Sequence, residues 1–437
     1  MGLDGFEFGG FGTMLDTGLS SFKQLRWPTA LPATVAARNS PLADYIHTLS
    51  QRTVRYTIYR ATNRYTCYGV RSCITTRRMA VVRIQAGDVA MQTLTPYLDE
   101  DPMAPMSCSS RRITVESPAR LHLGFVDLNG DLGRQFGSLG LALEDLSTTV
   151  VVESSAAFSI DGDDVARAEK YALSTLQAFE LPHRLALTVD NAIPEHAGLG
   201  SGTQLALAVA AAIAELFGLD HSVRELARIT GRGQRSGIGV GVFAEGGFVV
   251  DGGRGPDTVV PPLLARFEFP DDWRVVLVGD AKHQGLSGAA ERSAFEAMSP
   301  MHSGVAADLC RLTLMGVFPA LVERNFAAFT THIAAIQATM GAYFGPCQGG
   351  AFTSTNVAEA IDWLRATYEL VGVGQSSWGP TGFAFIEGEQ RADDIRASLA
   401  KRFATVPQLH FSVHRGRNRG AEISNYARTN AATMATG

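Results

Sequence analysis

The chain has 437 residues, 46% of them hydrophobic, so it is long enough to bury the cores of two or three ordinary domains. Its formal net charge of -5 excludes a general attraction to nucleic acid or to an anionic membrane surface. The five cysteines are scattered and odd in number, which excludes a dense disulfide framework and favours a reducing compartment. No apolar run is expected to cross a bilayer, so we predict a cytoplasmic protein with neither a nucleic-acid nor a membrane partner.

The first 105 residues are interpreted as an N-terminal extension. Between Tyr45 and Gly87 the sequence holds eight arginines and no acidic residue, and neither a helical nor an alternating pattern is sustained. Residues 1–105 are therefore predicted to be disordered or a non-native start, with a transit peptide or a basic arm as the alternative. Met103 and Met106 stand just before the first convincing strand, so either is a candidate first residue of the folded protein.

A first domain is predicted over residues 111–265. Alternating apolar and polar residues begin at Arg111, and a turn is expected at Asn129 and Gly130. Gly218 has the position of a glycine just past the end of a helix. The further elements predicted here are strands over 137–145, 147–155, 184–190 and 241–253, and helices over 164–179 and 204–217.

A second domain is predicted over residues 270–414, and its mixture of elements makes the whole chain α+β. Residues 415–437 are polar and are predicted to be a flexible tail. The elements predicted in this domain are strands over 273–280, 382–388 and 409–414, and helices within 305–344 and over 357–368 and 392–402.

A glycine-rich segment precedes the helix predicted over 204–217. It consists of Gly198, Leu199, Gly200, Ser201, Gly202 and Thr203. A helix N-terminus carries unpaired backbone N–H groups and a partial positive charge, and glycines ahead of it let the main chain wrap around an oxyanion. We interpret the segment as a phosphate cradle, the alternative being a turn needed only for close packing. It lacks both the Walker A lysine and the spacing of the dinucleotide fingerprint.

Three motifs resemble those of the GHMP small-molecule kinase superfamily. Pro194 and the cradle resemble its second motif, Pro-x-x-x-Gly-Leu-Gly-Ser-Ser-Ala. SPARLHLG, residues 117–124, resembles the first, and GVGQSSWGPTGFAF, residues 372–385, stands where the third belongs. The resemblance implies a GHMP-kinase-like two-domain α+β fold, with a ribosomal protein S5 domain 2-like N-terminal domain and a ferredoxin-like C-terminal domain. Gly202 replaces a serine that helps to hold Mg²⁺ in typical kinases, and the third motif lacks its glycine run.

These departures resemble one branch of the superfamily, the β-ribofuranosylaminobenzene 5′-phosphate synthases of tetrahydromethanopterin biosynthesis. The matching blocks lie within residues 111–414 and are SPARLHLGFVDLNG, GLGSGTQLALA, GRGQRSGIGVGVFAEGGFVVDGG, GLSGAAE and GQSSWGPTGFAF. The resemblance implies a decarboxylating pentosyltransferase that joins a para-substituted benzoate to phosphoribosyl pyrophosphate and releases CO₂ and pyrophosphate. It implies Mg²⁺ as the cofactor, and a homodimer is expected at the level of the family.

Basic side chains are required beside a departing pyrophosphate. Arg232 and Arg235 stand among glycines in GRGQRSGIG, and Arg120 and His122 alternate on one face of the first-motif strand, where both are expected to point into one cleft. We predict these four as catalytic residues. The alternatives are a solvated loop for the two loop arginines and a hydrogen-bonded core position for His122.

Other candidate residues are predicted to bind the metal or the substrates. Asp127 and Glu291 are predicted Mg²⁺ ligands, the alternative being that both are solvated acids. A polar and aromatic turn in the third motif is predicted to contact the benzoate, although a tryptophan there would equally suit a core. The substrate-binding residues predicted from this turn and from the end of the strand over 273–280 are Gln375, Ser376, Ser377, Trp378, Lys282 and His283.

Two other classes of function remain open at this point. One is an ATP-dependent small-molecule kinase of the same fold, and the other is a non-catalytic small-molecule sensor. A sensor would not need the basic residues Arg120, Arg232 and Arg235, which argue against it. Release of labelled CO₂ from a carboxyl-labelled benzoate separates the synthase from the kinase. The choice between 4-aminobenzoate and 4-hydroxybenzoate also stays open.

Overall fold

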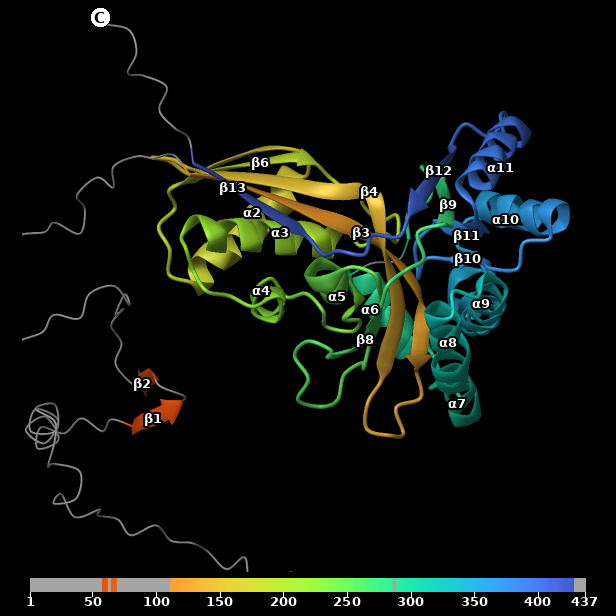
Figure 1. Cartoon of the computed structure of the whole chain (residues 1–437), viewed down its shortest axis with the longest axis horizontal. Helices are drawn as coiled ribbons and strands as arrows, with labels where there is room; N and C mark the ends of the chain where they lie inside the picture. Colours follow the sequence, from red (N-terminus) through yellow and green to blue (C-terminus); the bar gives the residue numbers. More distant parts are fainter. Residues whose placement is uncertain (1–56, 62–63, 69–110, 286–287, 428–437) are drawn as a thin grey trace, which may run out of the picture. The chain divides into compact units, whose positions relative to one another are not determined.

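The computed structural model describes residues 57–61, 64–68, 111–285 and 288–427 (Figure 1). The chain divides into two units, Met1–Leu98 and Asp99–Gly437. In the first unit, β1 (Thr57–Ala61) and β2 (Arg64–Tyr68) form an antiparallel pair. The remainder of the predicted N-terminal extension lies outside the described residues.

The larger unit opens with a seven-stranded sheet. Its order is β13-β3-β4-β6-β5, and β7 and β8 continue from β4. The long strands β3 and β4 pair with each other antiparallel, and only the pairing of β5 with β6 is parallel among the described strands of this sheet. The strands are β3 (Arg111–Asp127), β4 (Phe136–Ser154), β5 (Ser159–Gly162), β6 (Leu185–Asn191), β7 (Phe248–Asp251), β8 (Leu263–Phe267) and β13 (Glu422–Ala427).

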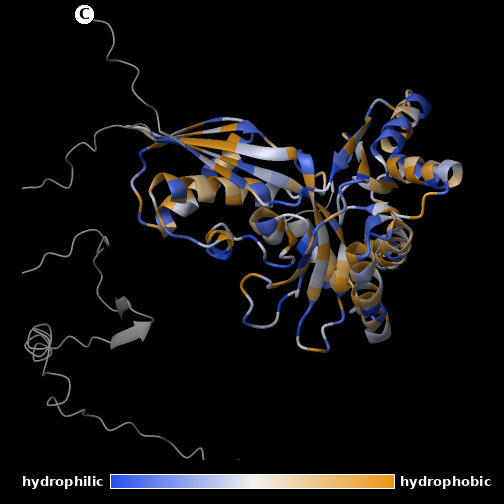
Figure 2. Cartoon of the chain, viewed as in Figure 1, coloured by the Kyte–Doolittle hydropathy of each residue, from blue (hydrophilic) through white to orange (hydrophobic). Residues whose placement is uncertain are grey.

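Helix α3 (Ser201–Leu216) packs against β3 and β4 and positions the cradle. Every residue from Gln204 to Ala214 is buried, as expected of a helix that is apolar on all sides. Its alanines are small enough to let the helix axis approach the sheet closely. Hydrophobic and polar residues are interspersed along the strands that it covers (Figure 2). The neighbouring helices are α2 (Val165–Ala178), α4 (Val223–Ile229) and α5 (Ile238–Glu245).

A second, four-stranded antiparallel sheet has the order β10-β11-β9-β12. Alternate residues of β9 face different layers: Val276 and Val278 pack with α10 and α11, whereas Val275 and Leu277 join a core that includes α9. The elements are β9 (Trp273–Asp280), α6 (Gly288–Ala297), α9 (Phe326–Gln348), α10 (Thr355–Tyr368), β10 (Val373–Gln375), β11 (Gly382–Glu387), α11 (Glu389–Arg402) and β12 (Leu409–Arg415).

One predicted strand is wrong for part of its length, and two others prove to be joined. The strand predicted over 241–253 begins only at Phe248, because residues 238–245 form α5. Six of the eight residues of α5 are buried, so this short helix shows no one-sided apolar pattern that would distinguish it from a buried strand. The two strands predicted over 137–155 are one continuous strand, β4.

One helical run, Ser303–Val322, has the length and hydropathy of a membrane-spanning helix, contrary to expectation. It consists of α7 (Ser303–Leu312), a π-helical turn, η1 (Thr313–Val317), and α8 (Phe318–Val322). Ala306 and Leu309 on its buried side join the core formed with β3 and α9. Less than half of the run, 39%, is buried, and this buried side packs as part of the core.

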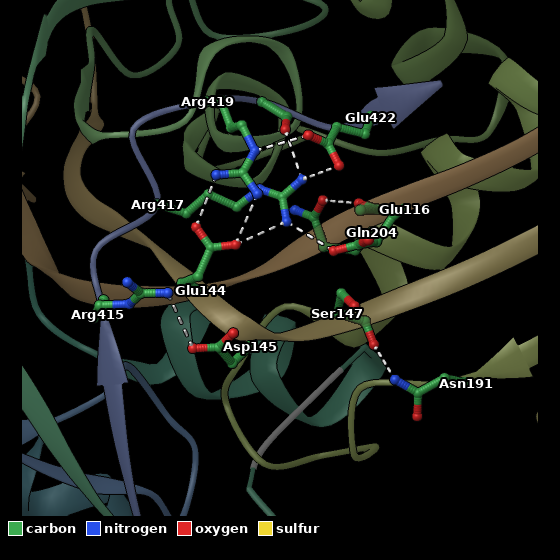
Figure 3. A network of polar contacts seen from close by, with 12 residues as sticks. Glu116, Glu144, Asp145, Ser147, Asn191, Gln204, Arg415, Arg417, Arg419 and Glu422 are labelled. Atoms are coloured by element: carbon green, nitrogen blue, oxygen red, sulfur yellow. Dashed lines mark hydrogen bonds and ion pairs between the residues drawn. The ribbon is translucent and has the colours of Figure 1, made fainter. Parts of the chain in front are cut away.

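The predicted flexible tail is wrong for residues 415–427. Strand β13 pairs with β3 at the edge of the first sheet, and Arg417 is only 1% exposed. The Arg417 guanidinium donates to Glu116 at 2.7 Å and to Glu144 at 3.3 Å, and Arg419 also pairs with Glu144 (Figure 3). Local composition concealed this segment because its partners lie about 300 residues earlier in the chain.

Replacing Arg417 by methionine is expected to lower the free energy of unfolding by about 3 kcal/mol, since it leaves Glu116 and Glu144 without the buried cation that both contact. Arg419→Met is the matched control: its side chain is 55% exposed, so its loss is expected to cost under about 1 kcal/mol. Urea unfolding followed by circular dichroism measures both values. Equal costs for the two variants would contradict the structural role of Arg417.

Candidate functional site

The three sequence motifs meet at the cradle. The backbone N–H of Arg120 in β3 donates to the carbonyl of Leu199 at 3.0 Å, which ties the first motif to the second. The Ser376 hydroxyl, from the third motif, donates to the Gly198 carbonyl at 2.7 Å and accepts from the backbone N–H of His122 at 3.0 Å. Segments separated by up to 254 residues are thus held against the start of α3.

Two glycines allow the backbones of the second and third motifs to touch. A Cβ atom added at Gly379 would lie 2.3 Å from the Cα of Gly198, so side chains are excluded at this contact. Gly200 is the N-cap of α3 and has φ of 88°, in the left-handed region that favours glycine. This conformation turns the chain into the helix without covering its first N–H groups.

The cradle opens into a cavity of about 380 Å³, here called the cradle cavity. The N–H groups of Ser201 and Gly202 lie too early in α3 for helical partners, and no other acceptor in the described part of the chain reaches them. They point the positive end of the helix at the cavity. The other residues on its wall are Arg120, Arg167, Glu195, His196, Gly198, Gly200, Thr203, Arg232, Gly288, Glu291, Ser377, Trp378 and Gly379.

Three arginines, Arg120, Arg167 and Arg232, concentrate positive charge on this cavity. Burial lowers the pKa of Arg120 to about 10, a value at which it is still charged at neutral pH. Burial also lowers the pKa of Arg232, and the nearby charge of Arg167 lowers it further. Cations that repel one another in a partly buried site are stabilised by an anion, so the cavity is suited to a multiply charged ligand.

Arg232 occupies space that the glycine at position 202 leaves open. Its guanidinium lies 5.0 Å from the centre of the Tyr171 ring, and its Nε is buried without a hydrogen-bond partner among the described residues. A Cβ added at Gly202 would approach Nη2 of Arg232 to 3.0 Å. The residue that departs from the kinase motif therefore brings an arginine to the first turn of α3.

Acidic residues also reach the cavity. Glu195 forms an ion pair with Arg167, with 3.3 Å between its Oε1 and the Nη1 of Arg167. Glu291 lies 3.0 Å from Nη1 of Arg235, and burial raises the pKa of Glu291 although the charges of Arg235 and Arg120 oppose the rise. Arg235 itself is not on the cavity wall. It contacts Glu291, which is on the wall, and its predicted catalytic role stays a prediction.

The family models that match are the GHMP kinases N terminal domain over residues 165–247 and the GHMP kinases C terminal domain over residues 317–405. The chain is 35% identical over 327 residues to a beta-ribofuranosylphenol 5'-phosphate synthase of Archaeoglobus fulgidus, covering 71% of this chain and 99% of that protein. The chain belongs to the beta-ribofuranosylphenol 5'-phosphate synthase family. A second member of this synthase family, from Methanothermobacter thermautotrophicus, is 30% identical over 331 residues, or 71% and 98% of the two chains.

A solved structure shows the same fold at lower identity. Mevalonate diphosphate decarboxylase from Staphylococcus aureus superposes with a TM-score of 0.54 at 16% identity, covering 72% of this chain and 98% of that one. The GHMP-kinase-like two-domain α+β fold implied by the three motifs is therefore confirmed for this member of the synthase family.

Besides Arg235, the predicted residues that lie away from the walls of the cradle cavity are Leu199, Asp127, Lys282, His283, His122, Gln375 and Ser376. Leu199 is buried in the core and contributes only its carbonyl, to Arg120. Asp127 accepts from the backbone N–H groups of Asn129 and Gly130 and so closes a turn. Lys282 and His283 lie in the turn that follows β9, where the Lys282 N–H donates to Asp280. Among the described residues, no group of three or more potential metal ligands is found.

Arg120 and His122 do not share one cleft. Arg120 lines the cradle cavity, whereas His122 lines a second cavity of about 500 Å³, and Ser377 lies on the wall of both. The third-motif turn separates the two side chains, since Ser376 and Ser377 hydrogen-bond to the backbone of His122. Gln375 also lines the second cavity, and Trp378 packs at a ring distance of 4.3 Å from Phe344.

Sequence reasoning missed Arg167, Glu195 and His196 on the wall of the cradle cavity. Glu195 and His196 directly precede the glycines of the cradle, so their position in the sequence was a usable signal. Arg167 comes from α2 and has no motif around it. Only the folded arrangement of α2 beside α3 brings it to the site.

Proposed function

We propose that the protein joins a para-substituted benzoate to phosphoribosyl pyrophosphate and releases CO₂ and pyrophosphate. The observation that carries this proposal is the cluster of Arg120, Arg167 and Arg232 around the free N–H groups at the start of α3. A pyrophosphate group carries several negative charges and oxygen acceptors, which match these donors. The names of the relatives describe a ribosylated phenol, so we expect 4-hydroxybenzoate to be the better acid.

The reaction needs charge stabilisation more than a general base. The bond between the ribose C1 atom and pyrophosphate breaks, and its electron pair leaves with pyrophosphate. The ring carbon that bears the carboxylate bonds to C1, and the electron pair of its bond to CO₂ returns to the ring as CO₂ leaves. No proton is lost from the reacting carbon. Preorganised arginines and helix N–H groups stabilise the leaving charge without rearranging during the reaction.

The cavity also fits a magnesium pyrophosphate. Glu195 and Glu291 are on its wall, and Mg²⁺ in phosphate sites commonly takes one or two carboxylates, with substrate oxygens and water completing its shell. Mg²⁺ bound there would neutralise part of the charge on pyrophosphate. Glu291 would meet it with the orientation that Arg235 imposes through their 3.0 Å contact.

The proposal is tested with carboxyl-labelled 4-hydroxybenzoate or 4-aminobenzoate, phosphoribosyl pyrophosphate and Mg²⁺. We expect labelled CO₂ and pyrophosphate in equal amounts, with 4-hydroxybenzoate turned over faster. Omitting phosphoribosyl pyrophosphate must abolish release. ATP-dependent phosphorylation of a small alcohol, with no CO₂ from either acid, would support the kinase alternative instead.

A further inference from the structure

The second cavity differs in chemistry from the cradle cavity. It lies between β3, α9 and the third-motif turn, and its volume of about 500 Å³ is typical of small-molecule sites, which span about 300–1,000 Å³. Its wall carries the aromatic rings of Phe125, Phe344 and Phe352. Small residues of α9, among them Gly341 and Gly345, provide the space.

A residue with a buried, unpaired hydrogen-bond donor lines this cavity. His122 is only 2% exposed, its Nδ1 accepts from the Gly124 N–H at 3.3 Å, and its Nε2 has no partner among the described residues. Burial lowers the pKa of His122 well below its usual value, and the charge of Arg120 lowers it further. The ring is therefore neutral, and because Nδ1 accepts, its proton is on Nε2, which is buried without a partner in a residue that lines the cavity.

The two cavities differ in the positive charge on their walls, and this difference suits them to different ligands. The second cavity has one arginine on its wall, Arg365, which is half-exposed and paired with Asp362 at 3.1 Å. A pyrophosphate would find too few donors there. A flat aromatic ring with one anionic oxygen group matches both the phenylalanine side chains and the unpaired donor of His122, since the glutamine amides on the wall already donate to backbone carbonyls.

We propose that the second cavity binds the aromatic acid, with the Nε2–H of His122 donating to its carboxylate. This inference rests on the proposed function. His122 and Ser377 stand at the partition between the cavities, so a carboxylate held there directs the ring carbon that bears it toward the ribose in the cradle cavity. The para substituent then points along α9, away from the bond that forms. His122 is a substrate-binding residue in this arrangement, and no proton transfer is assigned to it.

Two pairs of variants test the site through separate Michaelis constants for the acid and for phosphoribosyl pyrophosphate. His122→Gln extends an amide donor toward the Nε2 position, whereas His122→Asn is too short to reach it. Ala338→Trp fills the cavity from an exposed position of α9, and Thr331→Trp places the same side chain on an exposed position of α9 outside it.

We expect His122→Asn and Ala338→Trp each to raise the KM for 4-hydroxybenzoate by about tenfold or more, with the KM for phosphoribosyl pyrophosphate changed less than about twofold. His122→Gln should retain part of the acid affinity that His122→Asn loses, and Thr331→Trp, outside the cavity, should stay near wild type. Calorimetric titration of the acid into each protein should show the same order of affinities.

If Ala338→Trp and His122→Asn both kept the wild-type KM and affinity for the acid, the assignment of the second cavity would be overturned. The proposed function would still hold if the wild-type protein released CO₂. If the wild-type protein released no CO₂, the proposed function and this inference would fall together. If Ala338→Trp lost binding of phosphoribosyl pyrophosphate but kept binding of the acid, the two ligands would have to be assigned to the opposite cavities. That result would also overturn the assignment of the second cavity.

Discussion

Gly200→Val is expected to reduce turnover by about 10³-fold or more and to weaken the binding of phosphoribosyl pyrophosphate. Valine is strongly disfavoured at the φ of 88° that Gly200 adopts, and its Cβ would come within 2.8 Å of Cγ of Arg120. The substitution therefore displaces both the helix N-cap and an arginine of the cradle cavity. Steady-state rates of CO₂ release and calorimetric titration of phosphoribosyl pyrophosphate measure the two effects.

Gly133→Val is the matched control for backbone strain. Gly133 has a similar φ of 78°, but a Cβ added there meets no atom within 4 Å, and it lies in a turn outside the cradle cavity. The turnover of Gly133→Val should stay within about twofold of wild type. Its free energy of unfolding should fall by about 1–2 kcal/mol, the cost of a left-handed conformation for valine. Normal binding of phosphoribosyl pyrophosphate by folded Gly200→Val protein would show that the cradle does not hold its phosphates.

Arg232→Met is expected to lower kcat/KM by about 10²-fold, the effect of removing one preorganised donor from a developing negative charge. The methionine keeps an apolar stem against Tyr171, which Arg232 covers at 5.0 Å, and removes the cation. Removing it also relieves the repulsion that Arg167 exerts on Arg232, so the fold should tolerate the change. Affinity for phosphoribosyl pyrophosphate should fall, and affinity for the aromatic acid should not.

Arg228→Met removes a cation nearby without touching the site. Arg228 is an exposed residue in the last turn of α4 and is absent from the wall of the cradle cavity. Its kcat/KM should equal that of wild type at moderate ionic strength. If Arg228→Met lowered kcat/KM as much as Arg232→Met, general electrostatic attraction would explain both losses. A specific contact between Arg232 and the substrate would then be excluded.

The parts of the site that could be predicted are those that depend on residues adjacent in the sequence. The cradle is continuous in sequence, and the positive end of a helix follows from the order of its own residues, so Gly198 to Thr203 were accessible without a structure. Arg232 was accessible because glycines surround it. Arg167 was not, since its position depends on how α2 packs against α3 and on no residue near it in sequence.

Strand alternation was misleading at Arg120 and His122. It places both side chains on one face of the strand, and the pairing with β4 is indeed regular from Arg120 to His122. The third-motif turn, some 250 residues later, then packs against the backbone of His122 and forms the partition between two cavities. Periodicity within a strand carries no information about a segment that inserts from elsewhere.

The pairing of β13 with β3 also determines when the first sheet can be completed during synthesis. Synthesis runs from the N-terminus, so β3, β4 and α3 leave the ribosome long before residues 422–427 exist. Until then β3 has an unpaired edge, and Glu116 and Glu144 lack the arginine that neutralises them. The first sheet is completed only by the end of the chain. A nascent or truncated protein that lacks this end therefore exposes an edge open to pairing with another chain, and separate expression of the first domain requires β13 to be supplied with it.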